Sequence, residues 1–110
     1  MFIYNVTMNI AEEIHDEWLK WIKEKHIPEM LNLGIFTKAK MSEVLVEEEM
    51  GGTTYSVQYT TSSLELLDQY YNQHADKMRN DGAKLFKDKM LSFRTELKVI
   101  NEQFSQSSKN

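Results

Sequence analysis

Apolar and polar side chains alternate most regularly in the stretch Phe2-Ile-Tyr-Asn-Val-Thr-Met-Asn-Ile10. A period of two residues is typical of a β-strand with one buried face. The apolar face carries Phe2, Tyr4, Val6, Met8 and Ile10, and the opposite face carries Asn5, Thr7 and Asn9. The stretch therefore predicts a strand at the margin between a hydrophobic core and a second, polar surface.

A helix is expected directly after this strand. Asn9 and Glu12 have the spacing of a capping box, so the helix should begin at residue 10 or 11. Its apolar stripe follows a helical period, with Ile14, Trp18, Trp21 and Ile22 on one face. Pro28 predicts that the helix ends or kinks at about His26 and that a short further turn runs to Leu33.

The rest of the chain predicts three more strands and a second helix. Strands are expected at 35–48, with its end at 44–46 the clearest part, at 53–61 and at 91–99. Gly51 and Gly52 suit the tight turn between the first two of these. Ser62 and Glu65 form a second capping-box pattern, and Asn80-Asp-Gly82 is expected to interrupt the helix that follows.

The predicted order is β-α-β-β-α-β, an α+β ferredoxin-like fold with a four-stranded antiparallel sheet and two helices on one face. Right-handed crossovers favour the strand order 4-1-3-2. Residues 1–100 should form a single domain because neither half could bury a core alone. Residues 101–110 are polar and are expected to fray.

The sheet face without helices is the candidate functional surface. Tyr4, Val6, Met8, Tyr55, Val57, Tyr59, Phe93 and Leu97 are expected under the helices. The open side is expected to carry Asn5, Thr7, Ser56, Gln58, Ser92, Arg94 and Glu96. Such a face is either solvated or covered by a second copy, which would enclose a half-polar cavity.

Composition excludes several classes of protein. The chain has 110 residues, 13 Lys+Arg against 17 Asp+Glu, a net charge of −4 and no cysteine. The absence of cysteine rules out thiolate catalysis and cysteine-based metal sites, and it suits a reducing, cytoplasmic compartment. The acidic balance argues against a nucleic-acid partner. No apolar run is long enough to span a membrane, so no membrane partner is expected.

Several segments resemble a small bacterial family of unknown function. They are Ile3-Tyr-Asn-Val-Thr7, His15-Asp-Glu-Trp-Leu-Lys-Trp21, His26-Ile-Pro-Glu29, Tyr55-Ser-Val-Gln-Tyr59, His74-Ala75 and Phe93-Arg-Thr95. The family is similar to the dimeric α+β barrel superfamily, which includes antibiotic-biosynthesis monooxygenases, haem-degrading enzymes and muconolactone isomerase-like proteins. The resemblance implies a homodimer that pairs its sheets and keeps its helices outside.

The same resemblance implies a test for haem chemistry. Haem-degrading relatives use an Asn of the first strand, a central Trp and a His of the later helix, and this chain offers Asn5 and His74. The Trp is missing, since no tryptophan follows Trp21. No cofactor is therefore expected.

The histidines do not have the spacing of a metal site. His15 and His26 lie eleven residues apart, about 16 Å along a regular helix, so they cannot share an ion. His74 is interpreted either as a partly buried structural residue or as a general acid or base. His26 is expected at a helix C-terminus, where the dipole favours its protonated form.

Two functional hypotheses remain. In the first, a homodimer joined through the open sheet face binds a small anionic or aromatic ligand between the sheets, through Asn5, Thr7, Gln58 and Arg94. In the second, the chain is a cofactor-independent monooxygenase-like or isomerase-like enzyme with His74 or His26 as the proton carrier. The sequence alone does not decide whether the protein is an enzyme.

Overall fold

The strand predicted from residues 2 to 10 is confirmed, and it lies inside the sheet. The computed structural model describes residues 1–49 and 51–106; Met50, in the predicted turn, and 107–110, at the end of the predicted tail, lie outside the described residues. The sheet consists of β1 (Phe2–Ile10), β2 (Lys38–Glu43), β3 (Thr53–Thr61) and β4 (Met90–Lys98). Its order is β2-β3-β1-β4 with antiparallel pairing throughout, as predicted.

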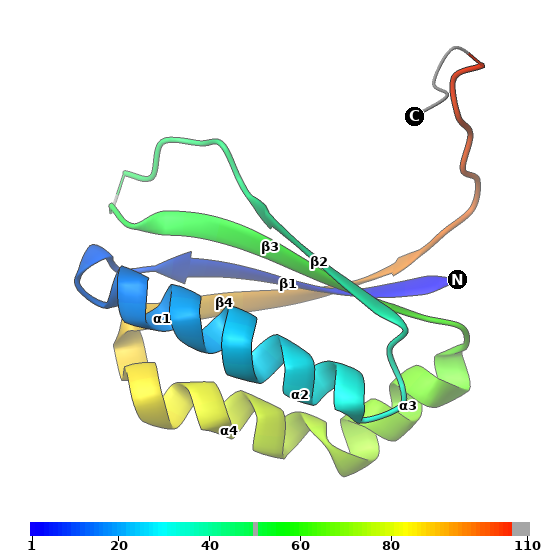
Figure 1. The fold of residues 1–110 in the computed structure, drawn as a ribbon, viewed down its shortest axis with the longest axis horizontal. Helices are drawn as coiled ribbons and strands as arrows, with labels where there is room; N and C mark the ends of the chain where they lie inside the picture. Colours follow the sequence, from blue (N-terminus) through cyan, green and yellow to red (C-terminus); the bar gives the residue numbers. More distant parts are fainter. Residues whose placement is uncertain (50, 107–110) are drawn as a thin grey trace.

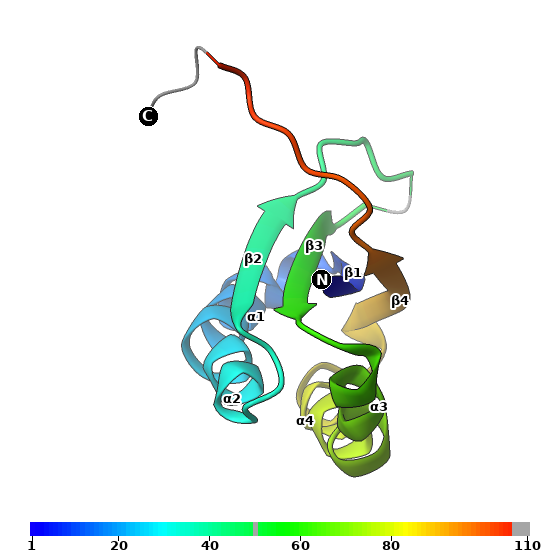
Figure 2. The same cartoon turned by 90° about the vertical axis from the view of Figure 1, so that its right-hand side faces the viewer.

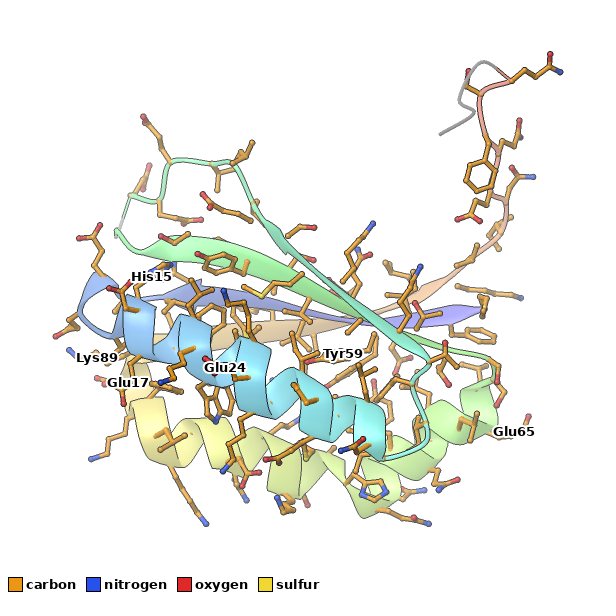
Figure 3. All side chains as sticks on the ribbon, viewed as in Figure 1. His15, Glu17, Glu24, Tyr59, Glu65 and Lys89 are labelled. Atoms are coloured by element: carbon orange, nitrogen blue, oxygen red, sulfur yellow. The ribbon has the colours of Figure 1, made fainter. Side chains whose placement is uncertain are left out.

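The helices cover one face of this sheet and leave the other open (Figure 1; Figure 2). They are α1 (His15–Trp21), α2 (Ile27–Asn32), α3 (Leu64–Gln73) and α4 (Ala75–Phe86). The core lies between the two layers and is rich in aromatic rings from both, with Trp18, Tyr59 and Tyr70 almost fully buried. Figure 3 shows Tyr59 in this position, between the sheet and the helices. Within the described residues, every helix is too short or too polar to cross a lipid bilayer.

The first helical layer continues past the proline that was expected to end it. A 3-10 turn (Glu12–Ile14) leads into α1, and a π-helical segment (Ile22–His26) joins α1 to α2, which has Pro28 in its first turn. Proline lacks an N–H and crowds the preceding turn, and a widened turn relieves both problems without ending the helix. The prediction of an end or kink at His26 is therefore corrected to a widened turn.

The second helical layer is also interrupted at a different residue from the one predicted. The break falls at His74, which has φ −131° and ψ −27°, and α4 then runs unbroken through Gly82. Gly82 is closely packed: a Cβ there would lie 2.8 Å from Met90 Cε and 3.2 Å from the Trp21 ring, so these side chains would have to shift. Both predicted caps also shift, because Ser63 rather than Ser62 accepts the Leu66 N–H, and the first turn begins after Ala11 without a side-chain cap.

The second strand is shorter than predicted. β2 ends at Glu43, and the stretch 44–46 that looked clearest lies outside the sheet. One backbone hydrogen bond to β3 follows, from the Val44 N–H to the Thr54 carbonyl at 2.8 Å, and the Thr54 hydroxyl donates to Glu48 Oε1 at 2.6 Å. Leu45 and Val46 are exposed beyond this point.

The largest correction concerns the two faces of β4. Val6 is paired with Arg94, and Thr7 is paired with Phe93. Cross-strand partners share a face, so Ser92, Arg94 and Glu96 lie on the helix side, and Leu91, Phe93 and Leu97 lie on the open side. The prediction had these faces exchanged, because it assumed that the apolar set of an amphipathic strand is the buried one.

Candidate functional site

A small cavity lies between the sheet and the helices, on the side of the sheet opposite to the predicted site. It has a volume of about 40 Å³, and its walls combine apolar side chains such as Met78 and Met90 with Tyr4, Arg79 and Arg94. A space of this size holds roughly two or three water molecules. We call it the arginine cleft, after Arg79 of α4 and Arg94 of β4.

The two arginines converge on one hydroxyl group. Arg94 Nε donates to Tyr4 Oη at 3.1 Å, and Arg79 Nη2 donates to the same oxygen at 3.4 Å. Tyr4 is almost fully buried at the centre of an aromatic cluster, where its ring contacts Tyr70 at 5.1 Å and Phe36 at 6.0 Å between centroids. The core therefore fixes the position of the Tyr4 hydroxyl. Guanidinium groups from α4 and β4 both donate hydrogen bonds to it.

Neither arginine has a carboxylate partner within the part of the chain that the structure describes. The ion pairs found there join lysine or histidine to Asp or Glu, as in Lys77 with Asp81. These are the only two arginines in the sequence, which has a net charge of −4. Two guanidinium groups without a carboxylate partner, beside a partly apolar cavity, are groups that can hold an anion.

Arg79 is held in place by its neighbours on the helix side. Its guanidinium lies over the Tyr71 ring, 5.9 Å from the centroid, and the Tyr71 hydroxyl donates to Glu96 of β4. Burial and this bond to Glu96 raise the pKa of Tyr71, so its hydroxyl stays protonated. Glu96 therefore accepts a bond from Tyr71, while Arg79 Nε is buried and has no partner among the described residues.

The π-helical segment brings Trp21 and His26 together at the cleft. Residues five apart on a regular α-helix differ by about 140° in direction, but the widened turn stacks these two rings with centroids 4.6 Å apart and planes 23° apart. His26 Nδ1 and Trp21 Nε1 are buried without a hydrogen-bond partner in the described part of the chain. Both residues line the cleft and can serve as neutral hydrogen-bonding groups there.

His26 is neutral at physiological pH. Burial lowers its pKa to about 4; the nearby Arg94 and Lys77 act in the same direction, and Asp81 acts against them. The prediction of a protonated imidazole at a helix C-terminus is wrong, because His26 lies inside a continuous helix and packs against the core. The positive charge of the cleft comes from the arginines alone.

A second hollow lies outside the cleft, between the first helix and α4. It has a volume of about 290 Å³ and is lined by charged side chains, among them Lys25, Lys77 and Lys84. Trp21 lines both spaces. The Trp21 ring is therefore the wall between the outer groove and the arginine cleft.

The four residues predicted to bind a ligand do not come together. Asn5, Thr7 and Gln58 lie on the open face as predicted, but Arg94 points to the helix side. Asn5 Nδ2 donates to Thr7 Oγ1 at 3.1 Å and its Oδ1 accepts from Ser56 at 2.6 Å, so these groups satisfy one another.

The histidines have separate environments. His74 is half-buried at the junction of α3 and α4 and lines neither hollow. His15, labelled at the start of α1 in Figure 3, forms a hydrogen bond of 2.6 Å between its Nε2 and the Tyr55 hydroxyl, which links α1 to β3. Among the described residues, no three His, Asp or Glu side chains meet in an arrangement that could hold a metal ion.

Arg79 and Tyr4 are the site residues that sequence reasoning missed. Tyr4 was assigned to the core, which is correct for its ring. Arg79 follows Met78 in α4, and a single cation on a helix does not by itself indicate a binding site. One signal was available: only two of the 13 Lys+Arg residues are arginines. One lies in the second predicted helix and the other in the last predicted strand.

Comparison with known proteins places this structure in a defined group. The model of the family described as "Domain of unknown function (DUF4286)" matches residues 1–100. A search of curated protein sequences found no significant match. The predicted resemblance to a family of unknown function is thereby confirmed.

Solved structures with the same fold come from several kinds of protein. A putative antibiotic biosynthesis monooxygenase from Deinococcus radiodurans is 12% identical with a TM-score of 0.68, covering 96% of this chain and 98% of its own. A dimeric ferredoxin-like protein from an uncultured marine organism is 14% identical with a TM-score of 0.67, covering 93% and 97%. A mutant of MhuD with two manganese protoporphyrin IX molecules per active site is 11% identical with a TM-score of 0.62, covering 96% and 100%. At these identities the likeness establishes the ferredoxin-like α+β fold and no activity.

The residues of this chain do not fit a haem site. Asn5 faces the open side of the sheet, whereas His74 lies in the helical layer on the other side. The arginine cleft, at about 40 Å³, does not hold a porphyrin. The set of residues that haem-degrading relatives imply is therefore not assembled here.

Proposed function

The chain belongs to the DUF4286 family, and we propose that it is a homodimeric protein that binds a small anionic molecule in the arginine cleft. The observation that carries this proposal is the convergence of both arginines on the Tyr4 hydroxyl without a carboxylate partner in the described residues. The ligand site moves from the open face, where it was predicted, to the helix side, because Arg94 lies there.

The lining of the cleft favours a carboxylic acid with an apolar body. Arginine binds carboxylates through paired, planar N–H groups, and each such bond is stronger in a partly apolar site than in water. Met78, Met90 and the Trp21 ring supply the apolar surface, and His26 supplies a neutral polar atom. A carboxylate would replace the single neutral oxygen that the two guanidinium groups now share.

The size of the cleft limits what enters it as it stands. About 40 Å³ suits a carboxylate group with little attached to it. A larger acid requires the Trp21 ring to turn, which would join the cleft to the outer groove of about 290 Å³. Methionine side chains, which are flexible, surround the site and can adapt to a ligand.

The open face supports the dimer. Leu91, Phe93 and Leu97 of the edge strand β4 form an exposed apolar strip there, with Phe93 71% exposed. Beside it, Asn5, Thr7 and Ser56 form a hydrogen-bonded polar centre. An apolar strip beside a polar, internally bonded centre suits a symmetric contact with a second copy, and one structural neighbour is described as a dimeric ferredoxin-like protein.

Binding of simple anions tests the ligand site. Acetate, propionate, benzoate and inorganic phosphate serve as probes in calorimetry and thermal unfolding, since a ligand that binds the folded state raises its stability. We expect saturable binding of at least one monocarboxylate in the millimolar range or tighter. Arg79→Gln and Arg94→Gln should each weaken it about tenfold or more.

Lys40→Gln is the matched control, because it removes the same charge from the open face. It should leave binding unchanged. Native mass spectrometry of the protein purified from cells adds a second readout, in which a bound small acid should disappear in Arg94→Ala. The proposal is wrong if no probe binds, or if the Lys40 variant weakens binding as much as the arginine variants do.

A proton-transfer enzyme is the second candidate, and His26 favours it. Its Nδ1 is buried at the cleft without a partner in the described residues. A neutral imidazole beside two arginines can take a proton from a carbon next to a bound carboxylate and return it to the same molecule, which requires no oxidant. Its pKa of about 4 makes it a weak base, so the exchange should be slow. Proton NMR in D2O should show exchange into one of the carboxylate probes that is lost in His26→Gln while binding remains. Equal exchange rates in both proteins would remove this candidate.

A further inference from the structure

Two segments extend from the sheet with exposed apolar side chains at their ends. Residues 44–49 follow β2 and carry Leu45, which is 87% exposed, and Val46. Residues 99–106 follow β4 and carry Ile100 and Phe104, which are 81% and 80% exposed. Figure 1 shows both segments rising on the side of the sheet that lacks helices. We call them the loop segment (44–49) and the C-terminal arm (99–106).

The pairing of the strands places these segments at diagonally opposite corners of the sheet. Glu43, the last residue of β2, lies beside Tyr55, which in turn pairs with Met8 of β1. Lys98, the last residue of β4, pairs with Phe2 at the other end of β1. The corners are thus separated by six residues along the strands, about 20 Å, and by three strand spacings, about 14 Å. Within one copy the two segments are on opposite edges of the sheet.

A two-fold axis can bring these corners together between copies. If two open faces pack against each other about an axis that lies between the sheets and runs perpendicular to the diagonal joining these corners, each of the two corners lies over the opposite corner of the partner. The strands then cross at a large angle, as in orthogonal sheet packings. In such an isologous dimer the contact between the two kinds of apolar segment occurs twice, once at each corner.

We infer that the C-terminal arm of each copy packs against the loop segment of the other, with Ile100 and Phe104 against Leu45 and Val46. The inference rests on the proposed dimer through the open face. It adds the relative orientation of the two copies and the segments that hold them together. It accounts for large apolar side chains at two sites that find no cover in their own chain among the described residues.

Cysteine pairs test this arrangement, because the chain contains no cysteine of its own. The full-length double variant Leu45→Cys/Phe104→Cys should form a covalent dimer under mild oxidation, visible on a non-reducing gel. Each single variant should stay uncrosslinked at the same concentration. The matched control Leu64→Cys/Phe104→Cys places the first cysteine at an exposed leucine of α3 and should give no covalent dimer.

The arm also makes a quantitative prediction. Ile100→Ser/Phe104→Ser should weaken dimerisation tenfold or more in sedimentation, with the unfolding of the monomer unchanged. A dimer that forms no disulfide in the double variant, or one that is crosslinked through Phe104→Cys alone, overturns the inference and leaves the proposed dimer in place. A chain that stays monomeric at high concentration overturns both.

Discussion

Alternate residues of the same strands form the two faces of the sheet, the helix side and the open side, and these faces differ in chemistry. On the helix side, Tyr4 and Tyr59 are buried in an aromatic core that ends at a cleft with two unpaired arginines. On the open side, Asn5 and Thr7 form a polar network next to an exposed apolar strip on β4. The helix side, where the strands follow the usual amphipathic pattern, holds the candidate binding site. The open side looks polar in the sequence, but its β4 residues expose apolar surface that no other described residue covers.

The difference between β1 and β4 makes this division clear. In β1, the apolar residues face the helices, which is the usual arrangement for a half-covered antiparallel sheet. In β4, Leu91, Phe93 and Leu97 face away from them, and Met90, Arg94 and Glu96 point toward the helical layer. An edge strand with this inverted pattern exposes its apolar side to water unless another molecule covers it.

Truncation of neighbouring residues on β3 should give the largest contrast between the faces. Tyr59 is almost fully buried, whereas Gln58 lies on the open face. Tyr59→Ala should lower the free energy of unfolding by about 3–5 kcal/mol, because it leaves a large cavity in the core. Gln58→Ala should change it by less than about 0.5 kcal/mol. Urea unfolding measures both, and similar losses for the two variants would refute the assignment of the faces.

His26 should make the helix side sensitive to acid. Its pKa is about 4 in the folded protein and 6.5 in the unfolded chain, so the unfolded state takes up the proton first as the pH falls. The stability that depends on a neutral His26 is complete above pH 6.5 and is lost toward pH 4, by up to about 3 kcal/mol.

Urea unfolding at a series of pH values compares wild type with His26→Gln, which does not titrate there. The wild type should show the steeper decline between pH 6.5 and 4. Parallel curves for the two proteins would mean that the imidazole is not buried in its neutral form.

Substitution of the apolar strip should affect assembly rather than folding. Phe93→Ser/Leu97→Ser should weaken the dimer about a hundredfold, ~3 kcal/mol, since a few large apolar side chains carry most of the energy of an interface. Analytical ultracentrifugation measures the change. Leu64→Ser/Leu85→Ser, at exposed leucines of the helical layer, is the control and should not alter dimerisation. Weakening by the control pair alone would place the interface on the helices.

Gly82→Ala should have the smallest effect on stability and a visible one on the cleft. Alanine favours a helix by about 1 kcal/mol over glycine, but the new Cβ would press on Met90 and Trp21. The two effects should leave stability within about 1 kcal/mol of wild type, while binding of the monocarboxylate probes weakens because Gly82 lines the cleft. Calorimetry and thermal unfolding on the same samples check both statements, and unchanged binding would contradict the second.

The sequence predicts the topology well and the site poorly, for physical reasons. Regular alternation in β1 and β3 defines strands, and the preference for right-handed crossovers sets their order, so the topology follows from sequence patterns and a general rule. Alternation in β4 defines two faces but does not say which one is covered. That choice depends on the pairing of Val6 with Arg94, which is a tertiary fact.

The cleft depends on similarly non-local features. Pro28 signals a disturbed helix, but it does not reveal that a widened turn will stack Trp21 on His26. Arg79 and Arg94 come from different elements and meet only because Tyr4 lies between them. Three of the predicted residues, Asn5, Thr7 and Gln58, lie on the predicted face, and their role in ligand binding stays a prediction.

The division of the sheet into a binding side and an assembly side is tested most directly by a crystal structure of the protein grown with benzoate. The account predicts the benzoate carboxylate on Arg79 and Arg94 at the Tyr4 hydroxyl, and two copies that meet through their open faces. Benzoate bound between the sheets on Asn5, Thr7 and Gln58, or copies that meet through their helices, would contradict it.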